Sequence, residues 1–130
     1  MTLSDKQYIL SRIGHPYDLQ NITGYSCWGL VADYYFHKSI EVPRFTAKST
    51  SVKDVADAFT VAFARNEHGF ILTTDIKNGD VIVFRSNCQF HCGLYFDGKC
   101  LHSSPAVNGI AYQELNTIHG FNKIEYWTLK

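Results

Sequence analysis

The sequence predicts an α+β domain, with helices in the first half of the chain and antiparallel strands in the second. Up to about residue 69, apolar residues recur every three or four positions, which is helical spacing. From Ile76 onward the apolar residues alternate with polar ones, as they do in strands. Because helices precede strands, we expect the N-terminal helices to pack on one C-terminal antiparallel sheet. The 130 residues fit a single domain spanning 1–130.

The composition argues against several classes of partner. Twelve basic and twelve acidic residues give a net charge of zero, so no electrostatic attraction to nucleic acid is expected. No run of about 18 apolar residues is present, so membrane insertion is not expected either. Residues 1–7 lack the pattern of a signal peptide, which predicts synthesis in the cytoplasm. The four cysteines, Cys27, Cys88, Cys92 and Cys100, are then expected to remain thiols.

Three helices are expected in the first half of the chain. The first begins with a capping box, Ser4–Gln7, and ends before Gly14. The second begins at or near Cys27, after turn-forming residues, and ends near residue 37 or 38. A polar connection follows, and the third helix is expected over about 51–66.

Five strands are expected in the second half, at 80–85, 90–96, 99–103, 109–115 and 123–129. The dipeptide Asp97-Gly98 lies between two alternating runs and predicts a hairpin with a two-residue type I′ loop. This loop sets the register, in which Phe96 faces Lys99 and the ladder continues to His91 and Ser104.

The register divides the hairpin residues between two faces of the sheet. One face carries His91, Gly93, Tyr95, Cys100, His102 and Ser104, and the other carries Cys92, Leu94, Phe96 and Leu101. His91 and His102 are then diagonal neighbours, about 7–8 Å apart at the backbone, and Gly93 leaves space between them. Two imidazoles at this offset can hydrogen-bond.

These residues are candidates for nucleophilic catalysis. A cysteine at a helix start has a lowered thiol pKa, because the N-terminal N–H groups favour an anion. Cys27 would be the nucleophile, His91 the base, and His102 the group that orients the base. The alternative is structural: Cys27 is then a small core residue, and the histidines are unrelated strand residues satisfied by backbone or water.

Zinc is a rival interpretation, because Cys88, His91, Cys92, Cys100 and His102 fall within fifteen positions. The Cys88-x3-Cys92 spacing is unusual for zinc, and the register leaves at most three ligands on one face. We therefore expect no metal and no other cofactor. A hairpin loop longer by one residue would reverse this argument.

Four segments, in order, resemble motifs of one enzyme family. They are Gly14-His15-Pro16-Tyr17, Tyr25–Val31 around Cys27, Asn78–Phe84, and Phe90–Tyr95 followed by Leu101-His102-Ser103. With these motifs the chain resembles the NlpC-type cell-wall cysteine peptidases, a bacterial and phage branch of the papain-like fold. The resemblance implies a papain-like domain that hydrolyses an amide bond in peptidoglycan stem peptides, commonly between D-γ-glutamyl and a diamino acid.

The resemblance also implies roles for single residues. Cys27 would be the nucleophile and oxyanion donor, His91 the general base and His102 the orienting residue. Tyr17 occupies the place of a family tyrosine beside the active site, so it would contact substrate. Ser26 replaces an acidic residue that often grips the substrate amine, and Trp28 replaces a small residue, so both are candidate substrate-binding positions.

The resemblance leaves other functions and several partners open. A phage tail-assembly protease or isopeptidase would use the same chemistry on protein, and an inactive binding module would use only the scaffold. A tryptophan after the cysteine looks like phage tail-associated members. Delivery by a phage tail or secretion machine to the periplasm or cell wall is therefore expected, although action inside the cell stays open. The partners would be a stem peptide, delivery machinery and an immunity protein.

Overall fold

The computed structural model describes residues 1–42, 69–86 and 90–129. In these ranges it contains the helices α1 (Leu3–Arg12) and α2 (Cys27–His37) and the short 3₁₀ helices η1 (Pro105–Val107) and η2 (Leu115–Thr117). The strands are β1 (Phe70–Leu72), β2 (Val81–Arg85), β3 (Phe90–Phe96), β4 (Lys99–Ser104), β5 (Gly109–Glu114) and β6 (Lys123–Leu129). The third predicted helix, at about 51–66, lies outside the described residues.

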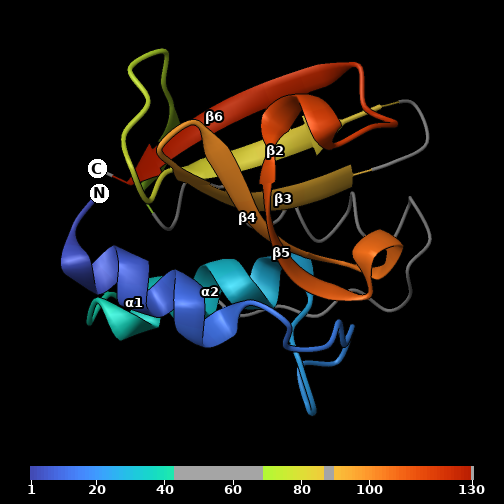
Figure 1. The fold of residues 1–130 in the computed structure, drawn as a ribbon. Coiled ribbons are helices and arrows are strands. Elements are labelled where there is room, and N and C mark those ends of the chain that lie inside the picture. The colour runs from blue at the N-terminus through green and yellow to red at the C-terminus, as the bar shows by residue number, and fades with distance from the viewer. Residues whose placement is uncertain (43–68, 87–89, 130) are drawn as a thin grey trace.

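The strands form one antiparallel sheet in the order β1-β6-β2-β3-β4-β5. Both helices lie on the same side of this sheet (Figure 1), and the larger hydrophobic core fills the space between the two layers. A smaller core on the opposite face contains Ile82, Phe84 and Cys100 and is covered by residues such as Phe121. The predicted α+β architecture is confirmed.

Helix α1 begins two residues earlier than a cap at Ser4 would allow, so that part of the prediction is wrong. The cap is Thr2, which has an extended backbone and whose Oγ1 accepts a hydrogen bond from the Asp5 N–H (3.0 Å). The Asp5 carboxylate faces α2, where it accepts a hydrogen bond from Tyr34 (2.9 Å) and pairs with Lys38 (3.3 Å). Because α1 starts earlier than predicted, Asp5 lies in its first turn, and from there it makes these contacts with Tyr34 and Lys38.

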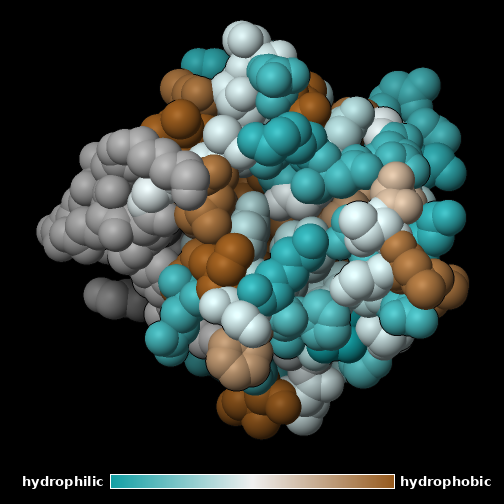
Figure 2. Space-filling view, turned by 90° about the vertical axis from the view of Figure 1, so that its left-hand side faces the viewer, coloured by the Kyte–Doolittle hydropathy of each residue, from teal (hydrophilic) through white to brown (hydrophobic). Residues whose placement is uncertain are grey.

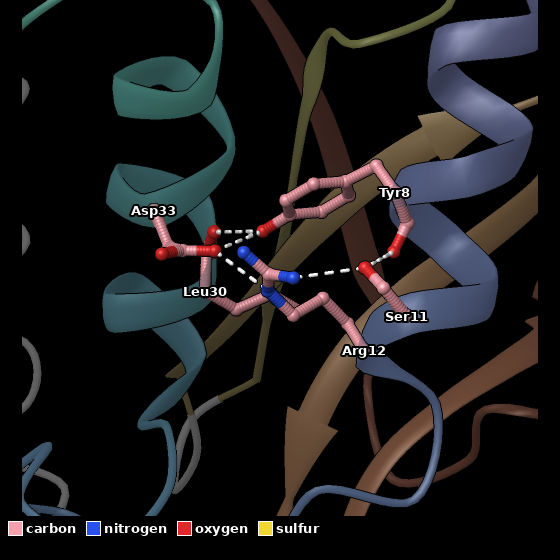
Figure 3. A network of polar contacts seen from close by, with 5 residues as sticks. All are labelled: Tyr8, Ser11, Arg12, Leu30 and Asp33. Carbon is pink, nitrogen blue, oxygen red and sulfur yellow. Dashed lines mark hydrogen bonds and ion pairs between the residues drawn. The ribbon is translucent and has the colours of Figure 1, made fainter.

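A polar network holds α1 against α2 (Figure 3). One oxygen of Asp33, on α2, accepts hydrogen bonds from the Tyr8 hydroxyl (2.6 Å) and from Arg12 Nε (3.0 Å). Arg12 also donates to Ser11, whose hydroxyl donates to the backbone oxygen of Tyr8. Burial, followed by the hydrogen bond to Asp33, raises the pKa of Tyr8, so the phenol remains a donor. The network fixes the position of α2 relative to the N-terminal helix.

The strands follow the sequence prediction closely, with one addition. Strands β3 and β6 have the predicted bounds, and β2, β4 and β5 differ by one residue at an end. Strand β1 was not predicted, because its three residues are too short to display an alternating pattern. Asp97 and Gly98 both have positive φ, 49° and 83°, as a type I′ loop requires.

The predicted register of the β3–β4 hairpin is confirmed near the loop but not along its whole length. The ladder pairs Phe96 with Lys99, Tyr95 with Cys100 and Leu94 with Leu101. The extension to His91 and Ser104 is wrong. Beyond Leu94, β3 continues only along β2 and β4 only along β5. The end of β4 is instead held by Ser103, whose hydroxyl donates to the Tyr25 backbone oxygen (2.6 Å).

The division of the hairpin between two faces is also confirmed. Cys92, Leu94, Phe96 and Leu101 belong to the core beneath the helices, whereas Cys100 and Tyr95 belong to the core on the other face. The surface is mixed: on the face drawn in Figure 2, apolar residues stand in separate groups among hydrophilic ones. Among the described residues, no helix is long and apolar enough to cross a membrane.

Candidate active site

Cys27 is the first residue of α2, as the sequence predicted. Ser26 caps this helix: its backbone is extended and its Oγ accepts a hydrogen bond from the Gly29 N–H (3.0 Å). The Cys27 N–H is therefore among the donors at the helix start, which have no acceptor within the helix itself. Cys27 as a residue is only partly buried, whereas Cys92 and Cys100 are buried.

Asn21 holds this cap in place. Its Oδ1 accepts a hydrogen bond from the Ser26 N–H (2.8 Å), and its Nδ2 donates to Ser26 Oγ (3.1 Å). Asn21 has a positive φ of 56°, which asparagine tolerates better than most residues. A Cβ at Gly29 would lie 1.8 Å from Asn21 Oδ1, so the approach of the loop to the helix requires a glycine there. The start of α2 is thus fixed by the hydrogen bonds between Asn21 and Ser26 and by the close approach of Asn21 to Gly29.

The segment before α2 is also attached to the sheet. A parallel bridge joins Tyr17 to Tyr25, and the Tyr25 backbone oxygen accepts the hydrogen bond from Ser103 at the end of β4. Ile110, on β5, donates its N–H to the His15 oxygen (2.9 Å). These contacts place the start of α2 against the edge of β3 and β4 where the two strands separate.

The Cys27 thiol lies against β3, where the side chains of Cys92 and His91 interact with it. The side-chain hydrogen bond with Cys92 is the largest cause that holds the pKa of Cys27 well below its ordinary value, and the hydrogen bond and charge of His91 act in the same direction. Burial opposes them without cancelling them. Burial, and then the proximity of Cys27, raise the pKa of Cys92. Of the two neighbouring sulfurs, Cys27 is therefore the one that loses its proton more readily.

His91 continues the contact toward the other face of the sheet. Its Nε2 lies 2.7 Å from Nδ1 of His102, so the predicted hydrogen bond between the two imidazoles is confirmed. The His91 ring stacks on Phe84 and Phe121, with centroid separations of 5.7 and 6.0 Å, which restrict its rotation. His102 is 3% exposed, and its Nε2 hydrogen-bonds to Oε1 of Gln113 on β5.

His102 is neutral at physiological pH. Burial, and then the nearby His91, lower the pKa of His102 to about 4, and the hydrogen bond to Gln113 opposes this only partly. A neutral imidazole has one donor and one acceptor nitrogen. His102 can therefore accept a hydrogen bond from His91 while it donates one to Gln113.

The position that a side chain at residue 93 would occupy is already filled by neighbouring atoms, as the predicted arrangement of the two histidines requires. A Cβ there would lie 2.4 Å from Cys100 Sγ and 3.0 Å from His102 Cβ. Glycine is therefore needed at this position for His102 to approach β3 closely enough to meet His91.

The three predicted substrate-binding residues have different environments. Tyr17 is half-buried near the thiol: burial, and then the charge of Cys27, raise the pKa of Tyr17. Ser26 is buried, and its hydroxyl is engaged by Gly29 and Asn21. Trp28 is 2% exposed and packs in the core against Phe70. The structure thus brings Tyr17 to the thiol, whereas Ser26 and Trp28 are occupied within the fold.

Among the residues that the structure describes, no three His, Cys, Asp or Glu side chains are grouped so that they could hold a metal ion. Cys88, one of the ligands weighed for zinc, lies outside these residues. Cys92 and Cys100 belong to the cores on opposite faces of the sheet, as predicted, so the geometric argument against zinc holds for this pair.

Sequence reasoning did not single out Asn21, Cys92 or Gln113 as parts of the site. Gln113 had a usable signal: β5 pairs with β4 so that Ala111 faces His102, which puts Gln113 diagonal to His102 on the same face. Cys92 reaches the thiol through a contact between β3 and α2, which no local pattern reveals, and Asn21 contacts Ser26, five residues later, from the loop before α2.

Comparison with known proteins identifies the family of this chain. The family model described as NlpC/P60 family matches residues 14–125, a stretch that covers most of the chain and includes the Cys27, His91, His102 and Gln113 positions. A search of curated proteins gave no significant match. The chain therefore belongs to the NlpC/P60 family, whose members are generally cysteine peptidases or amidases that act on peptidoglycan.

Proposed function

We propose that this protein is a cysteine endopeptidase or amidase that hydrolyses an amide bond in peptidoglycan stem peptides through a thioester on Cys27. The observation that carries the proposal is the placement of the Cys27 thiol beside His91, whose ring is hydrogen-bonded to His102. This arrangement supplies a nucleophile, a base and an orienting group in the order that acyl transfer needs.

In the first half of the reaction, the Cys27 thiolate attacks the carbonyl carbon of the scissile amide. The carbonyl oxygen becomes an oxyanion, which the N–H of Cys27 at the helix start is placed to stabilise. His91 then gives its proton to the leaving nitrogen, the C–N bond breaks, and a thioester on Cys27 remains. The shifted pKa of Tyr17 keeps its hydroxyl protonated, so it can donate a hydrogen bond to the substrate.

In the second half, water replaces the amine. His91 accepts a proton from the water as it attacks the thioester carbonyl, and the C–S bond breaks to release a carboxylic acid and Cys27. His102 does not exchange protons with substrate in this scheme. It accepts a hydrogen bond from His91 and so holds the base in position while positive charge develops on it.

For the bond, we propose the linkage between D-γ-glutamyl and a diamino acid, on the basis of family membership. Recognition of the free amine by Ser26 is not part of the proposal, because that hydroxyl is already engaged by Gly29 and Asn21. We further propose action in the periplasm or cell wall after delivery by a phage tail or secretion machine, supported by the likeness of Trp28 to phage tail-associated members. An immunity protein would be a natural partner of such a delivered enzyme.

The test is incubation of the purified protein with muropeptides, with the products analysed by mass spectrometry. Loss of a stem-peptide amide bond is expected, and Cys27→Ala and His91→Ala should abolish it while far-UV circular dichroism stays unchanged. His119→Ala is the matched control, because this histidine is exposed and lies outside the site. Cleavage of tail proteins but not muropeptides would favour the protease alternative, and cleavage of neither would favour a binding module.

A further inference from the structure

We infer that Gln113 is a positioning residue: by accepting a hydrogen bond from His102 Nε2, it fixes which nitrogen of His102 carries the proton and so orients the whole Cys27–His91–His102 series. This inference rests on the proposed function for its catalytic meaning. The hydrogen-bond geometry on which it depends does not require that function.

The contacts that carry the inference form one line across the sheet. His91 Nε2 lies 2.7 Å from His102 Nδ1, and His102 Nε2 hydrogen-bonds to Gln113 Oε1. Strand β5 supplies Gln113 at the register position opposite Cys100, diagonal to His102. Gln113 is half-buried, whereas His102 is almost completely enclosed, and within the described part of the chain Gln113 is the partner of His102 Nε2.

The protonation states of His91 and His102 determine which group donates and which accepts in the contact with Gln113. When His91 is an imidazolium, both of its nitrogens are donors, and its Nε2–H must find an acceptor at His102 Nδ1. A neutral His102 that accepts at Nδ1 carries its proton on Nε2, and that N–H needs an acceptor of its own. The carbonyl oxygen of Gln113 is that acceptor.

The opposite tautomer would reverse the pairing. A proton on His102 Nδ1 would face the Nε2–H of the His91 imidazolium across 2.7 Å, which places two donors against each other. The His91 imidazolium, which pairs with the Cys27 thiolate, would then lose the hydrogen bond that its Nε2–H donates to His102. Gln113 therefore favours the form of His102 that supports the charged pair.

The first test reads the tautomer directly. The ¹⁵N chemical shifts of the His102 ring, measured at pH 8 in labelled protein, report which nitrogen is protonated. We expect the proton on Nε2 in the wild type and in Gln113→Glu, which keeps an oxygen acceptor. Gln113→Met has similar length but no such acceptor, and it should show a substantial Nδ1–H population. Gln113→Ser, too short to reach His102, provides a second acceptor-free variant if the methionine variant does not fold.

The second test measures the consequence at the thiol. The rate at which iodoacetamide modifies Cys27 is followed against pH by peptide mass spectrometry. The titratable groups that face this sulfur are Cys92 and His91 from β3 and Tyr17 from the preceding loop. Gln113→Met should lower the rate at pH 6.5 about fivefold to tenfold, the size expected for loss of one hydrogen bond between neutral groups. Glu114→Met, an exposed neighbour on β5, is the control.

An Nε2–H tautomer retained in both acceptor-free variants would overturn the inference, as would alkylation profiles that match the wild type. A Gln113→Glu protein that behaves like Gln113→Met would overturn it as well, because the oxygen acceptor would then be irrelevant. Neither readout uses a cell-wall substrate. Failure of the muropeptide assay would therefore count against the proposed function without affecting the tautomer result.

Discussion

Replacing Gly93 with alanine should weaken both the fold and the site. The new Cβ would lie 2.4 Å from Cys100 Sγ, 2.9 Å from the Leu101 backbone oxygen and 3.0 Å from His102 Cβ. Cys100 and Leu101 are fully buried, so neither can move aside into solvent. Overpacking of this kind costs about 1–3 kcal/mol, and three simultaneous contacts favour the upper part of that range. We expect the free energy of unfolding to fall by about 2–3 kcal/mol.

Urea denaturation measures the stability loss, and steady-state kinetics on muropeptides measure its consequence for the site. Because His102 is pushed away from β3, its hydrogen bond to His91 should lengthen, which lowers kcat with little change in KM. Adding Cys100→Ala removes the shortest contact. The double variant should therefore recover part of the stability, with a coupling energy of at least about 0.5 kcal/mol between the two positions.

Gly98→Ala is the matched control for this prediction. Gly98 has a positive φ of 83°, but a Cβ there meets nothing within 4 Å. Its substitution should cost stability through backbone strain and leave kcat unchanged. A Gly93→Ala protein within about 0.5 kcal/mol of the wild type and with full activity would refute the reasoning, since surface-like tolerance is incompatible with the described packing.

Three further predictions concern the groups around the thiol and its helix. Cys92→Val removes the thiol that hydrogen-bonds to Cys27, so the pKa of Cys27 should rise and iodoacetamide labelling at pH 6 should slow; an unchanged rate would contradict this. Asn21→Ala should lower the free energy of unfolding by about 1–2 kcal/mol in urea, because the buried Ser26 N–H loses its acceptor; no loss would contradict the role of Asn21. The pKa of His102 is about 4 in the folded state, below its ordinary value of 6.5, so the unfolded chain binds the extra proton more readily. The contribution of His102 to stability should be constant above about pH 6.5 and fall as the pH drops toward 4, and His102→Asn should flatten the slope between these pH values in urea titrations; an equally steep slope would contradict the assignment.

The hairpin at the site could be predicted from sequence because its determinants are local. Asp97-Gly98 adopts the two positive φ angles of a type I′ loop, and residue parity then assigns His91 and His102 to one face. The ladder beyond Leu94 could not be predicted in the same way. It ends where Ser103 bonds to Tyr25, a residue 78 positions earlier in the chain.

Trp28 and the cap of α1 also show which features the local sequence could predict and which it could not. Trp28 lies on the buried stripe of α2 with Val31, Ala32 and Tyr35, a spacing that was visible in the sequence. Its position after Cys27 suggested a substrate contact, but the stripe indicates core packing. Thr2 and Ser4 both offer a capping hydroxyl, so the sequence alone did not distinguish them.

The most direct test of the account is competitive alkylation of the cysteines at pH 6 to 7. Iodoacetamide should modify Cys27 ahead of Cys88, Cys92 and Cys100, because Cys27 alone among the described cysteines has a lowered pKa and partial exposure. In His91→Ala this preference should weaken, whereas His119→Ala should retain it. Preferential modification of another cysteine, or a Cys27 rate that does not respond to His91→Ala, would contradict the claim that Cys27 is the activated nucleophile.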